Sequence, residues 1–261
     1  MKRLLIVCFM ALALVPNMQR AFAWGAKGHR IIAQVAYDNL NSKTRKQVDA
    51  VLGKHGMIYL AAWADEIKSD TIYPQSYDWH YQDLDGGLTD EQVVAMLTDY
   101  PTEGGNMFRV LDSLAVELKN NKDNHDALAF YVHLYADRFC PMHVAHLDDK
   151  GGNAVKMKWF GQNTNLHSVW DAKIIDSKGF TYSEYANYLH DVYGSEKKSV
   201  MKMTDEETIL MTYHLTDDIY QYHTTWNGNA YHYSYNWMDE MEWQMYVGAV
   251  KLAQALNAIY K

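Results

Sequence analysis

Two pairs of histidine and aspartate have a spacing that is suited to metal binding: His133 with Asp137, and His167 with Asp171. Residues four positions apart lie on one face of a helix, so each pair can offer an imidazole nitrogen and a carboxylate oxygen to the same ion. A single pair of this kind is more typical of a capped or ion-paired surface turn. Two pairs on different helices can converge inside a bundle, but the spacing alone leaves both interpretations open.

The start of the chain has the features of a secretory signal peptide. Lys2 and Arg3 form a positive beginning, residues 4–15 form an apolar run that is short for a membrane span, and residues 21–23 (Ala-Phe-Ala) form a small-x-small cleavage site. We therefore expect residues 1–23 to be removed and the protein to be exported, either to a periplasm or out of the cell. No later stretch is apolar for long enough to serve as a membrane anchor.

Cleavage at this site would make Trp24 the first residue of the mature chain. Its free α-amine, its carbonyl and the imidazole of His29 can all donate to one ion, because only four residues separate Trp24 from His29. The new terminus therefore adds a third candidate group of metal ligands to the two histidine–aspartate pairs.

The segments that carry these residues are predicted to be helices. Apolar residues recur at helical spacing over long stretches, strand signals are weak, and the chain has only four prolines. Ser42 is expected to cap the second helix, and the aromatic-rich stretch 226–243 fits either a loop or a helix. The expected helical ranges are 28–40, a helix after Ser42, 61–69, 107–120, 125–139, 165–175, 181–193, 205–222 and 236–260. They predict an all-α fold in which residues 24–261 form a single domain of packed helices.

Charge and cysteine content limit how the protein can bind its partners. The chain has 24 Lys and Arg residues against 32 Asp and Glu residues, a formal net charge of −8. A protein of this charge does not hold nucleic acid through a broad basic patch, so phosphate would have to be bound through fixed cations. Cys140 is the only cysteine after residue 23, so no internal disulfide can form, and bound metal could supply stability instead.

An ordered set of short motifs resembles one known family. In chain order, the motifs are Trp24-Gly-x-x-Gly-His29, Trp63-Ala-Asp65, His80-x-x-Asp83, His133-x-x-x-Asp137, Pro141-x-His143, Gly151-Gly-Asn153 and Asn165-Leu-His167-x-x-Trp170-Asp171. Each motif is weak alone, but the ordered set resembles the single-strand-specific nucleases with three zinc ions, the S1/P1 type. The chain after Asp171 matches mainly in its helical character. The resemblance implies the all-α fold that these nucleases share with zinc phospholipases C.

The resemblance also implies which residues hold the three zinc ions. Nine positions fall into three groups: Asp65, His80 and His133 for the first ion; the Trp24 amine and carbonyl with His29 for the second; and His143, His167 and Asp171 for the third, with Asp137 bridging the first two. Nitrogen and carboxylate oxygen are ligands that zinc prefers.

The implied reaction is hydrolysis of phosphodiester bonds. The family cuts single-stranded DNA and RNA to products with a 5′-phosphate, and it removes the phosphate of 3′-mononucleotides. Asp83 resembles the carboxylate that orients the attacking water, and Lys68 and Asn153 resemble the residues that stabilise the phosphate. A single strand can stack an unpaired base on an aromatic face beside the metals. The chain has 20 Tyr and 8 Trp, so no particular stacking residue is assigned.

Some positions depart from the family pattern or compete with it. Lys68 stands where many relatives have arginine, and a lysine lacks the bidentate fork, so weaker phosphate binding is expected. Cys140 stands where relatives often have glutamine, and we expect it to pack in the core rather than to bind metal. His146 is expected on the surface, since the Pro-x-His motif favours His143. The segment 148–153 is expected to be a tight turn that shapes the active site, since it lacks the carboxylate spacing of a calcium loop.

Two other functions fit part of the pattern. A zinc-dependent phospholipase C shares the N-terminal tryptophan and the three-zinc plan, but it typically closes its third site with His-x-x-x-Glu, whereas this chain has Asp171. A secreted zinc-binding protein without activity would leave Asp83, Lys68 and Asn153 unexplained. We expect a monomeric nuclease that takes single-stranded DNA, RNA and 3′-mononucleotides as substrates.

Overall fold

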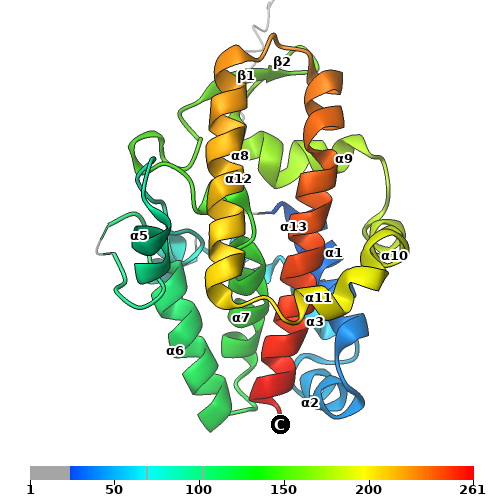
Figure 1. Cartoon of the computed structure of the whole chain (residues 1–261). Helices are drawn as coiled ribbons and strands as arrows, with labels where there is room; N and C mark the ends of the chain where they lie inside the picture. Colours follow the sequence, from blue (N-terminus) through cyan, green and yellow to red (C-terminus); the bar gives the residue numbers. More distant parts are fainter. Residues whose placement is uncertain (1–23, 69, 102) are drawn as a thin grey trace, which may run out of the picture.

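The computed structural model describes residues 24–68, 70–101 and 103–261 (Figure 1). The predicted signal peptide, residues 1–23, lies outside this part of the chain. The prediction of an all-α fold is confirmed for the described residues, since helices form nearly all of the regular structure and the sheet has two short strands. None of these helices combines the length and the apolar character that a bilayer crossing requires.

The elements begin and end as follows. The α-helices are α1 (Ala26–Asn39), α2 (Ser42–Leu52), α3 (Gly56–Tyr59), α4 (Trp63–Ile67), α5 (Asp90–Ala95), α6 (Met107–Asn120), α7 (His125–Asp137), α8 (Leu166–Ser168), α9 (Ile174–Ser177), α10 (Tyr182–Tyr193), α11 (Lys197–Val200), α12 (Asp205–Thr225) and α13 (Ala230–Ile259). The other helical turns are η1 (Pro74–Trp79), η2 (Pro141–His143), η3 (Leu147–Asp149), η4 (Val169–Lys173) and η5 (Gly194–Glu196), and the strands are β1 (Lys156–Trp159) and β2 (Gln162–Asn165).

The structure corrects the sequence-based elements in a few places. Asn41, not Ser42, caps α2, because its side chain accepts the N–H of Thr44. The ambiguous stretch 226–243 is helical from Ala230 onward. The expected helix over 165–175 is interrupted by η4, a turn of π-helix. The β1–β2 hairpin was missed because each strand has four residues, and β2 contains no apolar side chain.

Helix α7 lies at the centre of the fold. All its residues from Ala127 to Asp137 are buried, and α1, α4, α6 and α13 pack around it. A helix that is apolar on every side belongs in a core, so the two polar residues near its end, His133 and Asp137, stand out. Buried groups of this kind must be paired or must bind an ion.

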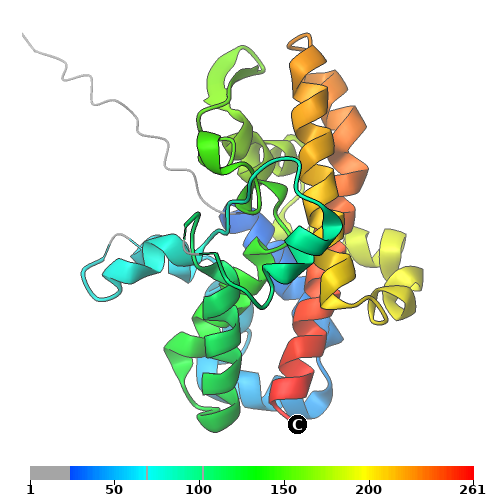
Figure 2. The ribbon, with the colours of Figure 1, turned by 60° about the vertical axis from the view of Figure 1, so that its left-hand side comes forward.

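The long helices α12 and α13 run in opposite directions along the molecule, and the first and last helices meet (Figure 1; Figure 2). Helix α1 packs against α13 and α10. Gly248 of α13 lies against the segment that follows α7, since a Cβ atom at this position would be 3.0 Å from the ring of Phe139. The glycine therefore lets α13 approach this segment closely.

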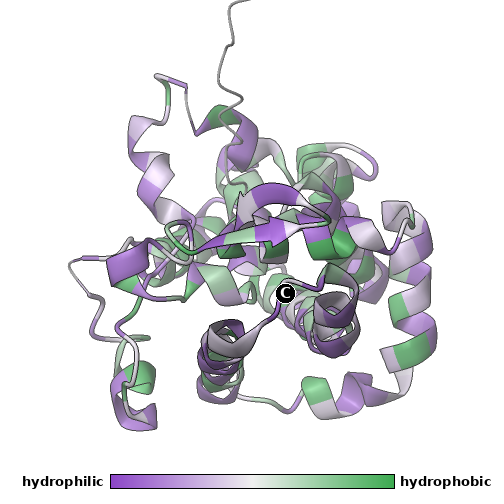
Figure 3. Ribbon diagram, turned by 90° about the horizontal axis from the view of Figure 1, so that it is seen from above, coloured by the Kyte–Doolittle hydropathy of each residue, from purple (hydrophilic) through white to green (hydrophobic). Residues whose placement is uncertain are grey.

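The hairpin crosses the upper end of the bundle, as the view from above shows (Figure 3). Its two-residue turn is Phe160-Gly161, and both residues have positive φ. At the other end of β2, the side chain of Asn165 accepts the N–H of Ser168 and so begins α8. The hairpin thereby delivers His167, in α8, to the interior.

Candidate metal centre

Asp137 lies between histidines that come from different elements. Its carboxylate is fully buried, and its Oδ2 atom lies 3.3 Å from Nε2 of His133, four residues earlier on α7. On the other side, Nε2 of His29 from α1 lies 3.2 Å from Oδ1. Each oxygen of Asp137 therefore faces a different imidazole, which is the arrangement that a bridging carboxylate needs.

The first predicted ligand group is assembled from α4, α7 and the residue after η1. Nδ1 of His80 lies 3.1 Å from Nε2 of His133 and 3.3 Å from Oδ2 of Asp137. Oδ1 of Asp65 lies 3.7 Å from the same atom of His80 and 3.8 Å from Nε2 of His133. Ligand atoms held about 2 Å from one zinc ion in a tetrahedron are about 3 to 4 Å apart, so these separations fit a shared ion.

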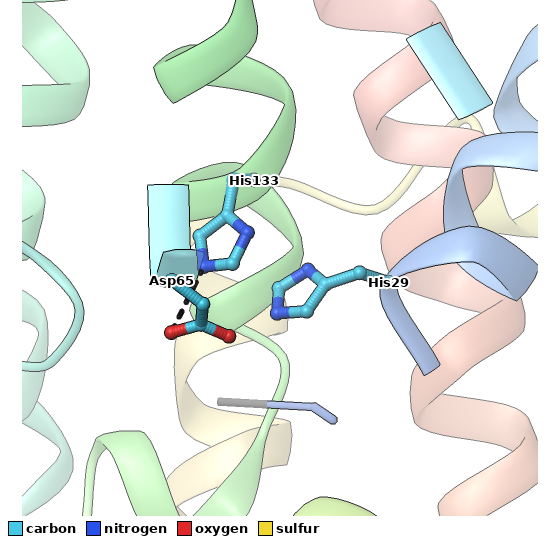
Figure 4. Close-up of side chains that lie close together, drawn as sticks. All are labelled: His29, Asp65 and His133. Atoms are coloured by element: carbon cyan, nitrogen blue, oxygen red, sulfur yellow. Dashed lines mark ion pairs between the residues drawn. The ribbon is translucent and has the colours of Figure 1, made fainter. Parts of the chain in front are cut away.

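The second predicted group lies beside the first. Figure 4 shows His29, Asp65 and His133 facing one another, and the rings of the two histidines stack with centroids 3.7 Å apart. Trp24 is fixed next to Asp137, because its indole Nε1 donates to the carbonyl of Ala136 at 2.9 Å. The carbonyl of Trp24 accepts the backbone N–H of His29 at 3.2 Å, so the two residues of this predicted group are also linked through the main chain.

The third predicted group combines η2, α8 and η4. Nε2 of His167 lies 2.9 Å from Oδ2 of Asp171, and Nε2 of His143 lies 3.5 Å from Oδ1. Asp171 lies in the π-helical turn, a rare geometry that is frequent at functional sites. Nδ1 of His143 also lies 3.9 Å from Oδ1 of Asp137, so the third group adjoins the other two.

Cys140 packs inside the core, as its sequence context predicts, and it also touches the third group. Its thiol donates to Oδ1 of Asp171 at a distance of 3.4 Å. Burial and the charge of Asp171 raise the pKa of the Cys140 thiol well above its usual range. The sulfur therefore remains protonated and acts as a hydrogen-bond donor to the carboxylate.

Backbone carbonyls orient three of the histidines. In each case Nδ1 donates to a carbonyl: His133 to Ala61 (2.6 Å), His167 to Gly151 (2.6 Å) and His143 to His80. A carbonyl can only accept, so Nδ1 carries a proton, and Nε2 is the nitrogen that remains to bind an ion. Because Nε2 is the atom that faces the carboxylates, each ring is held in the tautomer that binds metal.

The centre contains buried polar atoms that the described chain does not satisfy. Those without hydrogen-bond geometry to any partner include both ring nitrogens of His29, both carboxylate oxygens of Asp137, Oδ2 of Asp65, Nε2 of His80 and Nε2 of His143. Each such atom costs about 1–3 kcal/mol, and more if it is charged. Cations between these atoms would remove this cost, and the set of nitrogen and carboxylate donors fits zinc.

Burial and nearby charges set the protonation of the centre. Burial alone would raise the pKa of Asp137, but the charges of His133, His143 and His29 hold it well below its usual range, so the carboxylate is ionised. Burial lowers the pKa of His80 to about 4, which leaves that ring neutral. Burial also opposes charge on His143, but Asp137 and Asp171 outweigh it and raise the pKa of His143 to about 9.

Asp83 lies at the edge of the centre and is 8% exposed. Burial raises its pKa to about 8, with Asp149 adding to the shift and His143 opposing it. Its carboxylate adjoins Gly151, where a Cβ atom would be 2.9 Å from Oδ1 of Asp83 and 2.6 Å from the carbonyl of Met142. A carboxyl group with a pKa near neutrality is suited to accept and return a proton.

The other two predicted catalytic residues differ in position. Nζ of Lys68 lies 2.9 Å from Oδ1 of Asp65, so this cation touches a predicted ligand. Asn153 is partly exposed, and its amide donates to the carbonyl of Lys150. The tight turn before Asn153 is present as expected, because Lys150, Gly151 and Gly152 all have positive φ.

The sequence did not reveal the residues that fix this turn. His146 was predicted to lie on the surface, but it is half-buried and its ring stacks on that of Tyr220 at 3.9 Å. The hydroxyl of Tyr220 donates to Oδ1 of Asp149 at 2.8 Å. Backbone acceptors leave no signal in a sequence, whereas Tyr220 could have been found from its place on one face of α12.

Comparison with known proteins agrees with this geometry. A family model described as S1/P1 nuclease matches residues 24–261. Nuclease S1 of Aspergillus oryzae is 28% identical over 214 residues, which cover 76% of this chain and 73% of that protein. Endonuclease 4 of Arabidopsis thaliana is 27% identical over 184 residues, or 66% of this chain, and nuclease P1 of Penicillium citrinum is 29% identical over 161 residues, or 57% of this chain. The matched part spans 62% of the plant protein and 57% of the Penicillium protein.

Proposed function

Because the chain belongs to the S1/P1 nuclease family over residues 24–261, we propose that it is a zinc-dependent nuclease that hydrolyses phosphodiester bonds in single-stranded DNA and RNA. The observation that carries the proposal is the buried cluster around Asp137, which brings together ligand groups from separate parts of the chain. The names of the relatives, nuclease S1 and nuclease P1, support the same class of reaction.

The side chains at the centre would have different roles in hydrolysis. Bound zinc ions would polarise the phosphate and lower the pKa of a water molecule. Asp83 lies at the edge of the centre, and its carboxylate would orient this water and accept its proton. Lys68 would place a positive charge against the phosphate oxygens, and Asn153 would donate an amide N–H to them. The bond to the 3′-oxygen breaks, so the products carry a 5′-phosphate, and 3′-mononucleotides lose their phosphate in the same way.

We propose single strands as the substrate because the ligand side chains are buried. His29, Asp137 and His143 are each at most 2% exposed, so a scissile phosphate must enter between surrounding loops. A stacked duplex cannot bring its backbone into such a site without unpairing bases, whereas a single strand bends and splays its bases at lower cost. The net charge of −8 also disfavours binding of a duplex through a broad basic surface.

We further propose that cleavage after residue 23 releases an exported protein and creates a metal-binding amine at Trp24. The contact between the Trp24 indole and Ala136 supports this proposal, since it holds the residue beside Asp137. A variant that begins one residue before Trp24 should fold normally, bind one zinc ion fewer and lose most of its activity. Full activity in that variant would exclude the amine from the centre.

The deciding experiment measures release of 5′-mononucleotides from single-stranded DNA and RNA by protein that begins at Trp24. Activity is measured before EDTA treatment, after it, and after zinc is returned, with a duplex of the same sequence as the comparison substrate. We expect activity on single strands to disappear and then return, and hydrolysis of the duplex to be slower. The matched variant Asp137→Asn should bind less zinc and recover little activity.

Other outcomes would reject the proposal in distinct ways. Hydrolysis that survives EDTA would exclude zinc dependence. Bound zinc without any release of nucleotides would exclude the nuclease reaction, and phosphatidylcholine would then be the substrate that tests the phospholipase C reaction.

A further inference from the structure

One face of α12 holds the loops that carry the candidate metal ligands. The contacts of this face are Tyr213 to the carbonyl of Asp85 (3.0 Å), Thr216 to the carbonyl of Pro141 (3.0 Å), Asp217 to the ring of His146 (3.5 Å) and Tyr220 to the side chain of Asp149 (2.8 Å). The four residues follow the i, i+3, i+4, i+7 spacing of a single helix face. None of them belongs to the motifs that identify the family.

The contact at Tyr220 is the most consequential of the four. Oδ1 of Asp149 accepts the Tyr220 hydroxyl and also the backbone N–H of Gly152, the latter at 2.6 Å. The ring of Tyr220 stacks on His146 with an interplanar angle of 23°. The hydroxyl and the ring of one side chain therefore hold two points of the same turn.

The turn that Tyr220 holds also orients His167, a candidate metal ligand. The carbonyl of Gly151 accepts Nδ1–H of His167 at 2.6 Å, and the N–H of Gly151 donates to the carbonyl of His146 at 2.9 Å. The Gly151 carbonyl is thus fixed between residues that Tyr220 contacts directly or through Asp149. Its position decides whether Nε2 of His167 faces Asp171.

We propose that Tyr220 is a positioning residue for the third metal group, formed by His143, His167 and Asp171. Its hydroxyl fixes Asp149, Asp149 fixes the glycine turn, and the turn holds His167 in the orientation and tautomer that bind metal. This inference rests on the proposed function, because it takes zinc as the ion that the group binds. Partners that orient a ligating histidine typically change metal affinity by about 10- to 100-fold.

The test compares Tyr220→Phe with Tyr222→Phe. The first variant removes only the hydroxyl and keeps the ring that stacks on His146. The second removes a hydroxyl from the same helix that contacts Asn236 and His232 instead of the turn. Zinc titration of EDTA-stripped proteins, followed by calorimetry and by mass spectrometry of bound metal, gives the affinity and number of sites.

We expect three zinc ions in the wild-type protein and in Tyr222→Phe. In Tyr220→Phe, one site should weaken by about 10-fold or more while two remain unchanged. The weakened site should be the one that His167→Ala abolishes, so adding Tyr220→Phe to His167→Ala should change zinc binding no further.

Three sites of unchanged affinity in Tyr220→Phe would overturn the proposal. Equal weakening of all sites, or a lower thermal stability of stripped Tyr220→Phe than of stripped Tyr222→Phe, would also overturn it, because the hydroxyl would then support the fold in general. A wild-type protein that binds no zinc at all would instead reject the proposed function.

Discussion

At the scale of the residue, the candidate centre depends on which atom each side chain leaves available. His133, His143 and His167 each use Nδ1 on a backbone carbonyl, and each turns Nε2 toward a carboxylate. Both carboxylate oxygens of Asp137 face the centre, and no described group donates a hydrogen bond to either of them. The chemistry is therefore set as much by main-chain acceptors as by the side chains that a motif contains.

Position 151 has no space for any residue larger than glycine. A Cβ atom at this position would overlap the Met142 carbonyl and the Asp83 carboxylate, and φ is positive. We expect Gly151→Ala to lower kcat/KM on single-stranded DNA by more than 10-fold, with a loss of stability of about 1–3 kcal/mol from overpacking. The matched control is Gly161→Ala, where φ is also positive but no atom lies within 4 Å, so only a backbone cost of about 1–2 kcal/mol applies. Equal activity of the two variants in a steady-state assay would contradict this prediction.

Asp83 predicts how the stability of the metal-free protein depends on pH. Its pKa is raised from 3.8 to about 8 in the folded protein, mainly by burial, so between these values the folded state binds a proton that the unfolded state has released. The free energy of unfolding therefore falls as pH rises through this window. The stability that is linked to protonation of Asp83 is fully present only below the pKa of the unfolded state. Asp83→Asn removes this dependence.

Urea unfolding of EDTA-treated protein at several pH values measures the effect. The wild-type free energy of unfolding should fall more steeply toward pH 8 than that of Asp83→Asn. Parallel curves would show that Asp83 keeps an ordinary pKa.

At the scale of the element, the sequence predicts the ranges of the regular helices well, but it predicts irregular turns and contacts between segments poorly. The apolar periodicity of α6, α7 and α10 is local, so their ranges follow from the sequence to within a few residues. The π-helical turn at Asp171 was not predicted, because its packing involves segments that are distant in the sequence. The β1–β2 hairpin is local, but its four-residue strands carry too little apolar alternation to be recognised. The motifs also named Asp65, His80 and His133 correctly as a group that meets in space, but only family resemblance, not spacing, could relate residues on three separate segments.

The contact between α13 and the end of α7 can be tested through Gly248. A methyl group there would press on the ring of Phe139, two residues after Asp137, at 3.0 Å. We expect Gly248→Ala to lower the free energy of unfolding by about 1–3 kcal/mol, because the packed core has no space for it. Gly194→Ala is the control, since Gly194 has helical φ and no atom lies within 4 Å, and it should be neutral or stabilise by up to about 1 kcal/mol. Urea unfolding measures both, and an unchanged midpoint for Gly248→Ala would show that the helices can separate.

At the scale of the whole molecule, the ligand cluster is a buried polar core within an apolar one. Its residues come from α1, α4, α7, η2, α8, η4 and the residue after η1, His80, so the cluster connects most of the first two thirds of the fold. A bound ion adds stability by mass action, because the unfolded chain does not present this site.

Metal removal should therefore lower the melting temperature of the entire domain rather than loosen one loop. At zinc concentrations of 100 times Kd, each site contributes about 2.7 kcal/mol. Scanning calorimetry before EDTA, after EDTA and after return of zinc should show one transition that moves down and then back. The control Asp137→Asn should show a smaller shift. If EDTA left the melting temperature unchanged, the buried carboxylates would be stable without bound cations.

The packing of α1 against α13 has a consequence for the order in which the protein folds. Helix α1 ends at Asn39 and α13 begins at Ala230, and contacts between segments so far apart in the chain form slowly. We therefore expect the surroundings of His29, which α1 carries, to be completed late in folding, after the local helices that hold His133 and His167 have formed.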